Sequence, residues 1–311
     1  MPDGYFPQAT SVLRHVHEQR VVGRVYGQHS LLVQATHPLA FTGLTASTNG
    51  LGMPFARLTR TATAMERVFF GDKDEVDKLC ARVRMMHSRV QGVITEQAGK
   101  WAAGTHYSAN DPEFLLWILA CLAEGALAVY EDFVGELDAD QRESYWQDYR
   151  LVGELFGLDR ELSPASYDLF KQYMEARLQS DDLFVTDYAR QVATFVSLHV
   201  PLPSKKKVAM PALRLAVIGS LPQQVRELYG MRWTKSESRR YGVLTATHRQ
   251  MYPLIPSQIR VGQCAPDFSA IAHEEAKRPE ESWPDWVLEA RQQYRFASNE
   301  KVQAAVKAAN S

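Results

Sequence analysis

An apolar helix pattern limits the folds open to this chain more than any other segment does. Asp111-Pro112-Glu113 has the composition of a helix start, with a capping carboxylate, a proline in the first turn and an acid near the positive end of the helix dipole. The segment that follows is apolar on most sides, up to about Gly135. Because a helix without a polar face needs other elements around it, we expect this helix at the centre of the fold.

Helix patterns also dominate the rest of the chain, and no segment shows a convincing strand alternation. The sequence therefore predicts an all-α fold in which residues 1–235 form one domain. After Trp233 the composition turns polar and prolines recur. We expect residues 236–311 to form a C-terminal extension of extended segments that wraps the same domain.

Composition is that of a soluble globular protein, with 311 residues of which 45% are hydrophobic and 23% charged. The formal net charge of −1 gives no electrostatic case for a nucleic-acid partner or an anionic membrane. Cys80, Cys121 and Cys264 are far apart and form no CxxC pattern. Such a scattered set argues against a disulfide framework and fits a reducing cytoplasm.

No export signal is visible in residues 1–10, which lack a basic start and an apolar stretch. The most apolar run, residues 114–123, is interrupted by Glu124 and is shorter than a membrane span requires. We therefore expect a cytoplasmic protein without a membrane span.

A histidine on a predicted core-facing stripe is the main candidate for a metal ligand. We predict a helix that begins after Asp72 or Asp74. Residues three and four apart on this helix form one core-facing stripe, which comprises Val76, Leu79, Cys80, Val83, Met86, His87, Val90 and Ile94. A neutral imidazole among such neighbours can ligate a metal. On spacing alone, a core histidine with a hydrogen-bond partner is the more common explanation.

Other histidines are weaker candidates. His37 directly precedes Pro38 at the predicted end of a buried helix, and it is the alternative ligand, although we expect a structural role. His15 and His17 would face one side of a strand, but we favour a surface helix on which they are solvated.

An arginine and a hydroxyl share one face of the helix predicted for residues 54–70. Arg57, Thr61 and Ala64 are spaced by four and three, beside a separate core stripe. Two explanations stay open at this point: a solvated helix edge, or an arginine and a hydroxyl presented together to a bound group. The loop 43–52 lacks the spacing of a phosphate cradle, and the chain offers no Ser–His–Asp pattern, so nothing supports a kinase or a hydrolase.

Several motifs in a fixed order carry a resemblance to a known family. They are Leu31-Leu-Val-Gln-Ala-Thr-His37-Pro38, Arg57-x-x-Arg60-Thr61, Val68-Phe69-Phe70-Gly71, His87-x-x-Val90-x-Gly92, Tyr107-Ser-Ala109-x-Asp111-Pro112 with Trp117, Leu155-Phe156-Gly157, and Leu221-Pro222-x-x-Val225-Arg226-x-x-Tyr229-Gly230-x-x-Trp233. Over roughly residues 20 to 235 the chain resembles the MpaB-type oxygenases and rubber oxygenase (latex clearing protein), which are haem b proteins that cleave carbon–carbon double bonds.

The resemblance implies a globin-like, multi-helix core around one haem b. His87 would be the proximal iron ligand, and Arg57 and Thr61 would be catalytic groups that line the haem pocket. Arg60 is a weaker candidate for contact with the cofactor. A cation or hydroxyl donor near the iron would stabilise negative charge that develops during dioxygen chemistry, and a guanidinium can instead clamp a haem propionate.

Two departures from rubber oxygenase narrow the implied activity. Where that enzyme has a lysine able to ligate iron, this chain has Arg60, whose guanidinium offers no lone pair, so we expect an open or water-filled sixth position. Residues 34–56 contain no Glu or Asp to match the catalytic glutamate of the rubber-cleaving enzymes. These departures argue against a polymer and for a small or medium hydrophobic metabolite as the substrate.

The sequence thus predicts a haem b-dependent oxidoreductase or oxygenase that uses dioxygen. The alternatives are a non-catalytic haem-binding sensor or storage module and a haem-free helical protein. Cleavage, hydroxylation and desaturation all stay open, as do the electron donor and the oligomeric state, a homodimer included.

Overall fold

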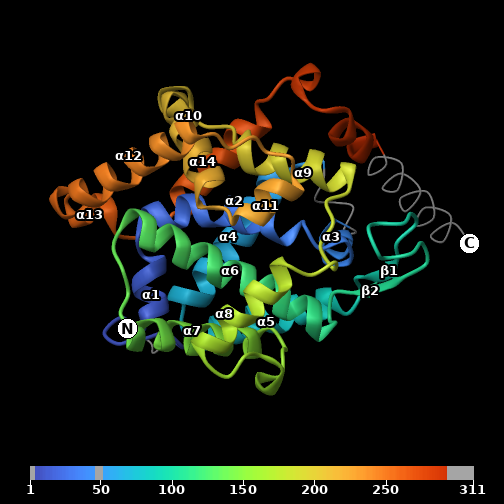
Figure 1. Cartoon of the computed structure of the whole chain (residues 1–311), viewed down its shortest axis with the longest axis horizontal. Coiled ribbons are helices and arrows are strands. Elements are labelled where there is room, and N and C mark those ends of the chain that lie inside the picture. Colours follow the sequence, from blue (N-terminus) through green and yellow to red (C-terminus); the bar gives the residue numbers. More distant parts are fainter. Residues whose placement is uncertain (1–3, 46–51, 293–311) are drawn as a thin grey trace, which may run out of the picture.

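The chain is mainly helical in the computed structural model, which describes residues 4–45 and 52–292 (Figure 1). The helices are α1 (Val12–His17), α2 (Arg20–Gln34), α3 (Pro38–Thr45), α4 (Pro54–Phe70), α5 (Lys73–His87), α6 (Pro112–Phe133), α7 (Ala139–Leu155), α8 (Tyr167–Leu178), α9 (Asp187–Leu198), α10 (Met210–Ser220), α11 (Gln223–Leu228), α12 (Lys235–Met251), α13 (Ser257–Arg260) and α14 (Ala265–Ala276). Short 3₁₀ turns cover Arg160–Leu162, Ser204–Ala209, Tyr252–Leu254 and Glu280–Ser282, and residues 285–292 are also helical. The all-α prediction is confirmed.

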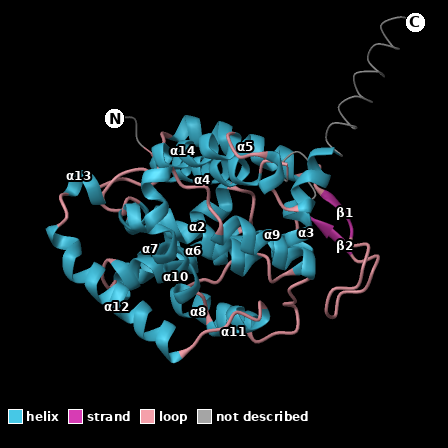
Figure 2. Ribbon diagram, turned by 90° about the horizontal axis from the view of Figure 1, so that it is seen from above, coloured by secondary structure: helices cyan, strands magenta, loops and turns pink. Residues whose placement is uncertain are grey.

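The only sheet within the described residues is a small hairpin of β1 (Gln91–Val93) and β2 (His106–Ser108). The strands are antiparallel, with Gly92 opposite Tyr107. Figure 2 shows the hairpin at the edge of the molecule beside α3. It is too small to contribute a layer of its own, so the core is built from helices alone.

Helix α6 lies at the centre, as predicted. Asp111 caps it by accepting a hydrogen bond from the Glu113 backbone N–H at 2.9 Å. Its main partner is α2, and α7, α10 and α12 pack around it (Figure 1). A Cβ atom at Gly125 would lie only 2.7 Å from the His29 ring, so glycine is what allows α2 to approach so closely.

The central helix has the predicted extent, and its apolar part is longer than the ten-residue run 114–123. Helix α6 has 22 residues, and its most apolar 18-residue window has a mean hydropathy of 1.7. By length and composition it is able to cross a membrane, so the prediction that this run is too short is wrong. However, 67% of that window is buried inside the fold, and buried core helices commonly share this composition.

Within residues 236–292 the chain is largely helical rather than extended. Its prolines stand at helix starts: Pro253, Pro256 and Pro266 occupy the first turn or the N-cap of the Tyr252–Leu254 turn, α13 and α14. This position suits proline because the first helical N–H groups have no intrahelical acceptor. Helix α14 packs along α4, and one continuous core extends from Phe6 to Val287. The domain boundary at residue 235 stays a prediction.

Candidate active site

The start of α4 positions Arg57 and depends on a distant carboxylate. Met53 offers no side-chain cap, and Pro54 occupies the first turn. The buried carboxylate of Glu275, on α14, accepts hydrogen bonds from the backbone N–H groups of Phe55, at 3.0 Å, and Ala56. Glu275 therefore caps the N-terminus of α4 in place of a local side chain.

Arg57 is half-buried in the first turn of α4. Its guanidinium donates a hydrogen bond to the carbonyl oxygen of Leu44, near the end of α3. Burial lowers the pKa of Arg57, and the neighbouring cation of Arg60 adds to this effect. Arg57 is thus held between two helices, with guanidinium N–H groups that the Leu44 contact does not use.

Thr61 lies one turn further along the same helix and is exposed. Its hydroxyl donates to the Arg57 carbonyl oxygen at 3.2 Å, which leaves the lone pairs of the hydroxyl available as acceptors. Arg60 is also exposed. All three polar side chains therefore come from the first two turns of α4.

His87 is the last residue of α5 and is half-buried. Its Nδ1 atom is enclosed and has no hydrogen-bond partner among the described residues. Burial lowers the pKa of His87, so the ring is neutral at physiological pH. The other nitrogen, Nε2, is not among the enclosed atoms, which makes it the nitrogen that a ligand can reach.

The predicted core stripe around His87 is wrong in its second half. Helix α5 ends at His87, and the Val90 N–H bonds the His87 carbonyl oxygen at 2.9 Å in the turn that leads to β1. Val90 therefore leaves the helix, and Ile94 follows the strand. Met86 is 53% exposed and its neighbour Met85 is 56% exposed. As a result, His87 stands beside exposed apolar side chains rather than inside the core.

The structure does not bring all the predicted site residues into direct contact. Arg57 and Thr61 lie at the start of α4, and His87 lies at the end of the following helix, α5. No hydrogen bond or ring contact within residues 4–45 and 52–292 joins either of the first two to His87. A bound group that contacts both Arg57 and His87 would therefore have to span the distance between α4 and α5.

Comparison with known proteins assigns the chain to a family. Residues 14–250 match the family described as "ER-bound oxygenase mpaB/B'/Rubber oxygenase, catalytic domain". The chain belongs to this family. It is also 25% identical over 205 residues to two uncharacterized mycobacterial proteins, Mb2261 of Mycobacterium bovis and Rv2237 of Mycobacterium tuberculosis. Each match covers 65% of this chain and 76% of the relative. No solved structure matches the chain.

Membership of the mpaB/rubber oxygenase family confirms the predicted resemblance and supports an enzymatic, oxygenase role. The described residues contain no cluster of three or more His, Cys, Asp or Glu side chains arranged for a metal ion. Haem iron does not need such a cluster, since the porphyrin supplies four nitrogens and the protein only axial ligands. A neutral histidine with one accessible nitrogen, as at His87, fits that requirement.

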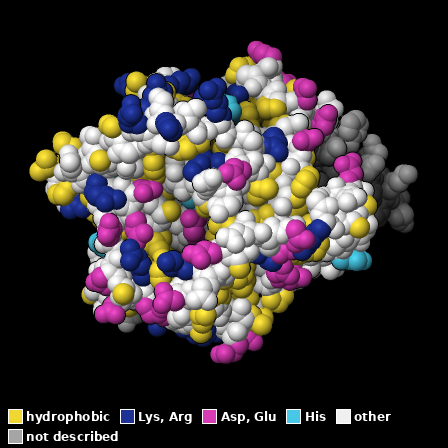
Figure 3. Space-filling view, in the orientation of Figure 1, with side chains coloured by type: hydrophobic (Ala, Val, Ile, Leu, Met, Phe, Trp, Pro, Cys, Tyr) yellow, Lys and Arg dark blue, Asp and Glu magenta, His cyan; other side chains and the backbone are white. Residues whose placement is uncertain are grey.

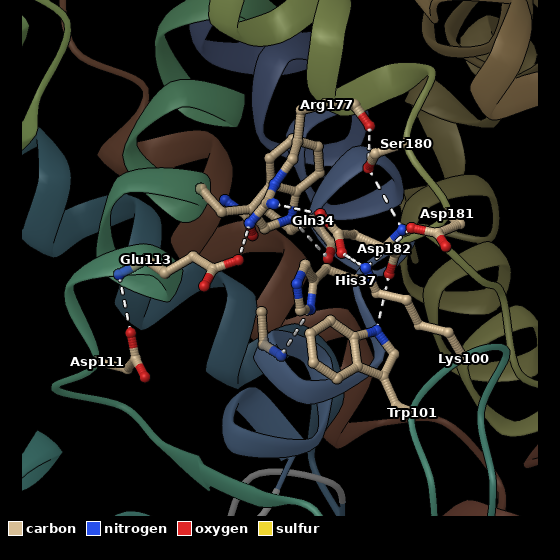
Figure 4. Close-up of polar contacts among 12 residues, drawn as sticks. Gln34, His37, Lys100, Trp101, Asp111, Glu113, Arg177, Ser180, Asp181 and Asp182 are labelled. Carbon is tan, nitrogen blue, oxygen red and sulfur yellow. Dashed lines mark hydrogen bonds and ion pairs between the residues drawn. The ribbon is translucent and has the colours of Figure 1, made fainter.

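His37, the alternative ligand, lies in very different surroundings (Figure 4). It is fully buried, and its ring lies 5.4 Å from that of Trp101 and 5.1 Å from that of Phe114. Its Nδ1 accepts the Ala40 backbone N–H at 3.4 Å, whereas Nε2 is enclosed without a partner in the described part of the chain. Burial lowers the pKa of His37 to about 4, with the nearby cation of Arg177 adding to the effect. Aromatic rings thus enclose the His37 side chain.

A network of ion pairs surrounds His37 and its aromatic neighbours and joins separate parts of the chain. Arg177, on α8, pairs with Glu113 at the start of α6 and with Asp182. Lys100, in the β1–β2 loop, pairs with Asp181 at 2.9 Å (Figure 4). The network fixes the loop around His37, which supports a structural role for that histidine.

Sequence reasoning missed a second buried polar network. His29 is fully buried on α2, with Nε2 2.8 Å from a carboxylate oxygen of Glu124 and Nδ1 2.9 Å from the Ser220 hydroxyl. The three residues come from α2, α6 and α10, so no local motif indicates them. The Ser220 hydroxyl is also within 3.1 Å of the Val217 carbonyl oxygen, and the ring is closed off from solvent. We interpret the network as a link between core helices.

His17 also departs from the prediction of a solvated histidine. It is buried, bonds the Tyr149 hydroxyl at 2.7 Å and stacks on Phe69 at a centroid distance of 4.1 Å. The surface-helix prediction is therefore wrong for His17, because α1 packs its far side against α7.

Proposed function

We propose that this chain is a haem b-dependent oxygenase that acts with dioxygen on a small or medium hydrophobic metabolite, with His87 as the proximal iron ligand. The proposal includes the globin-like helical core predicted from the sequence. The observation that carries it is the His87 ring, which is neutral, has one nitrogen that is not enclosed and lies at the end of α5 in a member of an oxygenase family. Bound haem would supply the redox chemistry that activates dioxygen.

Exposed apolar side chains near His87 suit the face of a porphyrin. Met85 and Met86 precede the ligand, and Val93, 44% exposed, follows it on β1. Methionine packs adaptably against flat apolar groups. A bound haem would cover such side chains and remove their apolar surface from water.

Arg57 and Thr61 would act from α4. The guanidinium of Arg57 would stabilise negative charge that develops on the oxygen side of the site, or hold a propionate. Thr61 would orient a polar group through its free lone pairs. Arg60 is exposed, and therefore suits a propionate at the edge of the haem better than it suits the reacting centre.

Residues 34–56 contain no Glu or Asp, and this absence favours a small metabolite over a polymer as the substrate. Glu275 supplies a carboxylate at the start of α4, but the backbone N–H groups of Phe55 and Ala56 engage both of its oxygens. We therefore assign Glu275 the role of a cap, not of a catalytic base.

The test of the ligand is the haem content of His87→Ala. We expect this variant to purify with at most about a tenth of the wild-type haem, while its far-UV circular dichroism stays helical, because the axial bond anchors the cofactor. His106→Ala, which changes an exposed histidine on β2, is the matched control and should keep full haem.

His37→Ala separates the two candidate ligands. If His87→Ala keeps its haem and a folded His37→Ala loses it, His37 is the ligand and the assignment above is wrong. Haem binding by the wild type without substrate-dependent oxygen consumption would instead indicate the alternative function, a haem-binding sensor or storage module.

A further inference from the structure

A cavity of about 390 Å³, partly open to solvent, lies between α10, α12 and the segment that precedes α12. Both views of the fold place these helices well away from α5 (Figures 1 and 2). The cavity is therefore separate from the site proposed around His87 and from any haem bound there.

The charged lining of the cavity is predominantly cationic. It consists of Arg214, Arg232 and Arg240 with one acid, Glu237. The Glu237 carboxylate is already engaged, since it accepts hydrogen bonds from the Thr234 backbone N–H at 2.6 Å and the Thr234 hydroxyl at 2.9 Å in the capping box of α12. These hydrogen bonds from Thr234, helped by the nearby Arg232 and Arg240, lower the pKa of Glu237. The three arginines exceed the single acid in number, so the Glu237 charge offsets only part of the positive charge.

Two of these guanidinium groups have no partner within the described chain. Arg232 and Arg240 make no hydrogen bond and no ion pair there, and both are exposed. Arg214, by contrast, donates to the Leu198 carbonyl oxygen at 2.6 Å. Figure 3 shows Lys and Arg side chains gathered over the α10 end of the molecule, which adds to the positive potential at the cavity.

The apolar lining is held in place by a motif whose role is otherwise unexplained. Trp233 ends the run Leu221–Trp233, and the Arg226 guanidinium lies 5.1 Å from its ring centroid. Arg226 also donates to the carbonyl oxygen of Leu221, just after α10. The Tyr241 ring meets Trp233 edge-on at 6.1 Å. Trp233 is thus oriented by two neighbours before any ligand binds, and Ile218 and Leu215 are among the other apolar residues that line the cavity.

We propose that this cavity binds an amphipathic anion, with a carboxylate or phosphate head at Arg232 and Arg240 and a short apolar chain against Ile218 and Trp233. A guanidinium matches the two oxygens of such a head group in a bidentate arrangement. Burial of the chain removes apolar surface from water on both partners. The volume suits a small molecule rather than a folded partner.

The test is isothermal titration calorimetry of the full-length protein with decanoate, which measures the Kd. We expect Arg232→Gln and Arg240→Gln each to weaken the Kd about tenfold, because each removes a charge-assisted hydrogen bond. Arg239→Gln is the matched control: Arg239 is an exposed arginine beside Arg240 that does not line the cavity, and its loss should change the Kd less than twofold. The neutral analogue 1-decanol should bind at least about tenfold more weakly than decanoate.

Three results would overturn the proposal. One is the absence of decanoate binding to the wild type. Another is an equal loss in Arg239→Gln and Arg232→Gln, which would reduce the effect to surface charge. The third is binding to phosphatidylglycerol vesicles that decanoate does not compete for, which would make the arginines a membrane-facing surface rather than a small-molecule site.

Discussion

The surroundings of each histidine determine the chemistry open to it. His87 and His37 are both neutral because burial lowers the pKa of each ring, but only His87 has a nitrogen that is not enclosed. His29 has partners on both nitrogens. Of these three rings, His87 therefore has a nitrogen that could bind iron, and the other two have the contacts of structural residues.

Arg57→Ala should keep haem and lose turnover by roughly 100-fold, the typical loss when one preorganised donor is removed. Substrate-dependent oxygen consumption measures the loss, and the Soret absorbance measures the haem. Arg67→Ala is the control, since Arg67 is exposed on the same helix and forms only a surface pair with Glu75 at 3.6 Å. Wild-type turnover in Arg57→Ala would make Arg57 a purely structural link to Leu44.

The candidate site residues that could be predicted lie a few residues apart in the sequence, whereas those that could not be predicted come from distant segments. Arg57 and Thr61 are one helical turn apart, so their common face can be predicted from periodicity. Glu275 contacts residues 55 and 56 from α14, and nothing in the local sequence indicates that contact. Pairings between distant segments follow from the packing of whole helices, which a single sequence does not specify.

At the scale of helices, α4 is the element on which the proposed site depends most. Its first turn carries Arg57, and the turn is closed by the Glu275 carboxylate rather than by a local cap. A change on α14 can therefore alter the position of Arg57.

Glu275→Ala should lower the free energy of unfolding by about 2 kcal/mol, because it leaves two N–H groups at the start of α4 without an acceptor. Urea unfolding at pH 7 measures the effect. Glu274→Ala is the control: Glu274 is on the same helix and forms only a surface pair with Lys277 at 3.4 Å, so its loss should change stability by less than about 0.5 kcal/mol. Equal stabilities of the two variants would contradict the capping role.

Helix existence could be predicted better than helix ends. The start of α6 follows from Asp111, whose side chain caps the backbone as expected. The end of α5 at His87 could not be predicted, because the apolar spacing continues through Val90 although the backbone turns into β1. Tertiary packing of the hairpin overrides the local periodicity there.

At the scale of the whole molecule, buried neutral histidines should make the fold sensitive to acid. Burial lowers the pKa of His37 to about 4 and that of His17 to about 3, from an ordinary value of 6.5. Below pH 6.5 these two histidines bind protons in the unfolded chain but stay neutral in the folded protein. Stability is therefore fully present above about pH 6.5 and falls as the pH is lowered towards 4.

For His37 alone the loss between pH 7 and pH 5 should be about 2 kcal/mol. Urea unfolding of the wild type and of His37→Phe at both pH values isolates this contribution. Burial raises the pKa of Asp148 and Glu275, and these groups act in the opposite direction, but they are common to both proteins. The same pH dependence in both proteins would contradict the assignment to His37.

The all-α class could be predicted from the sequence because helix periodicity is a local property, whereas the assembly of the helices could not. Prolines after residue 250 indicate interruptions, but only the structure shows that helices follow them and that α14 covers α4. The continuous core from Phe6 to Val287 depends on that contact.

We propose that this oxygenase-family chain binds haem through an accessible iron site. The most direct measurement is the absorption spectrum of the wild-type protein, expressed with haem supplied, taken oxidised, then reduced, then with carbon monoxide. We predict a Soret band that shifts on reduction and shifts again with carbon monoxide, because His87 would hold one side of the iron and leave the other open. A colourless protein that also fails to take up added haem would contradict the claim.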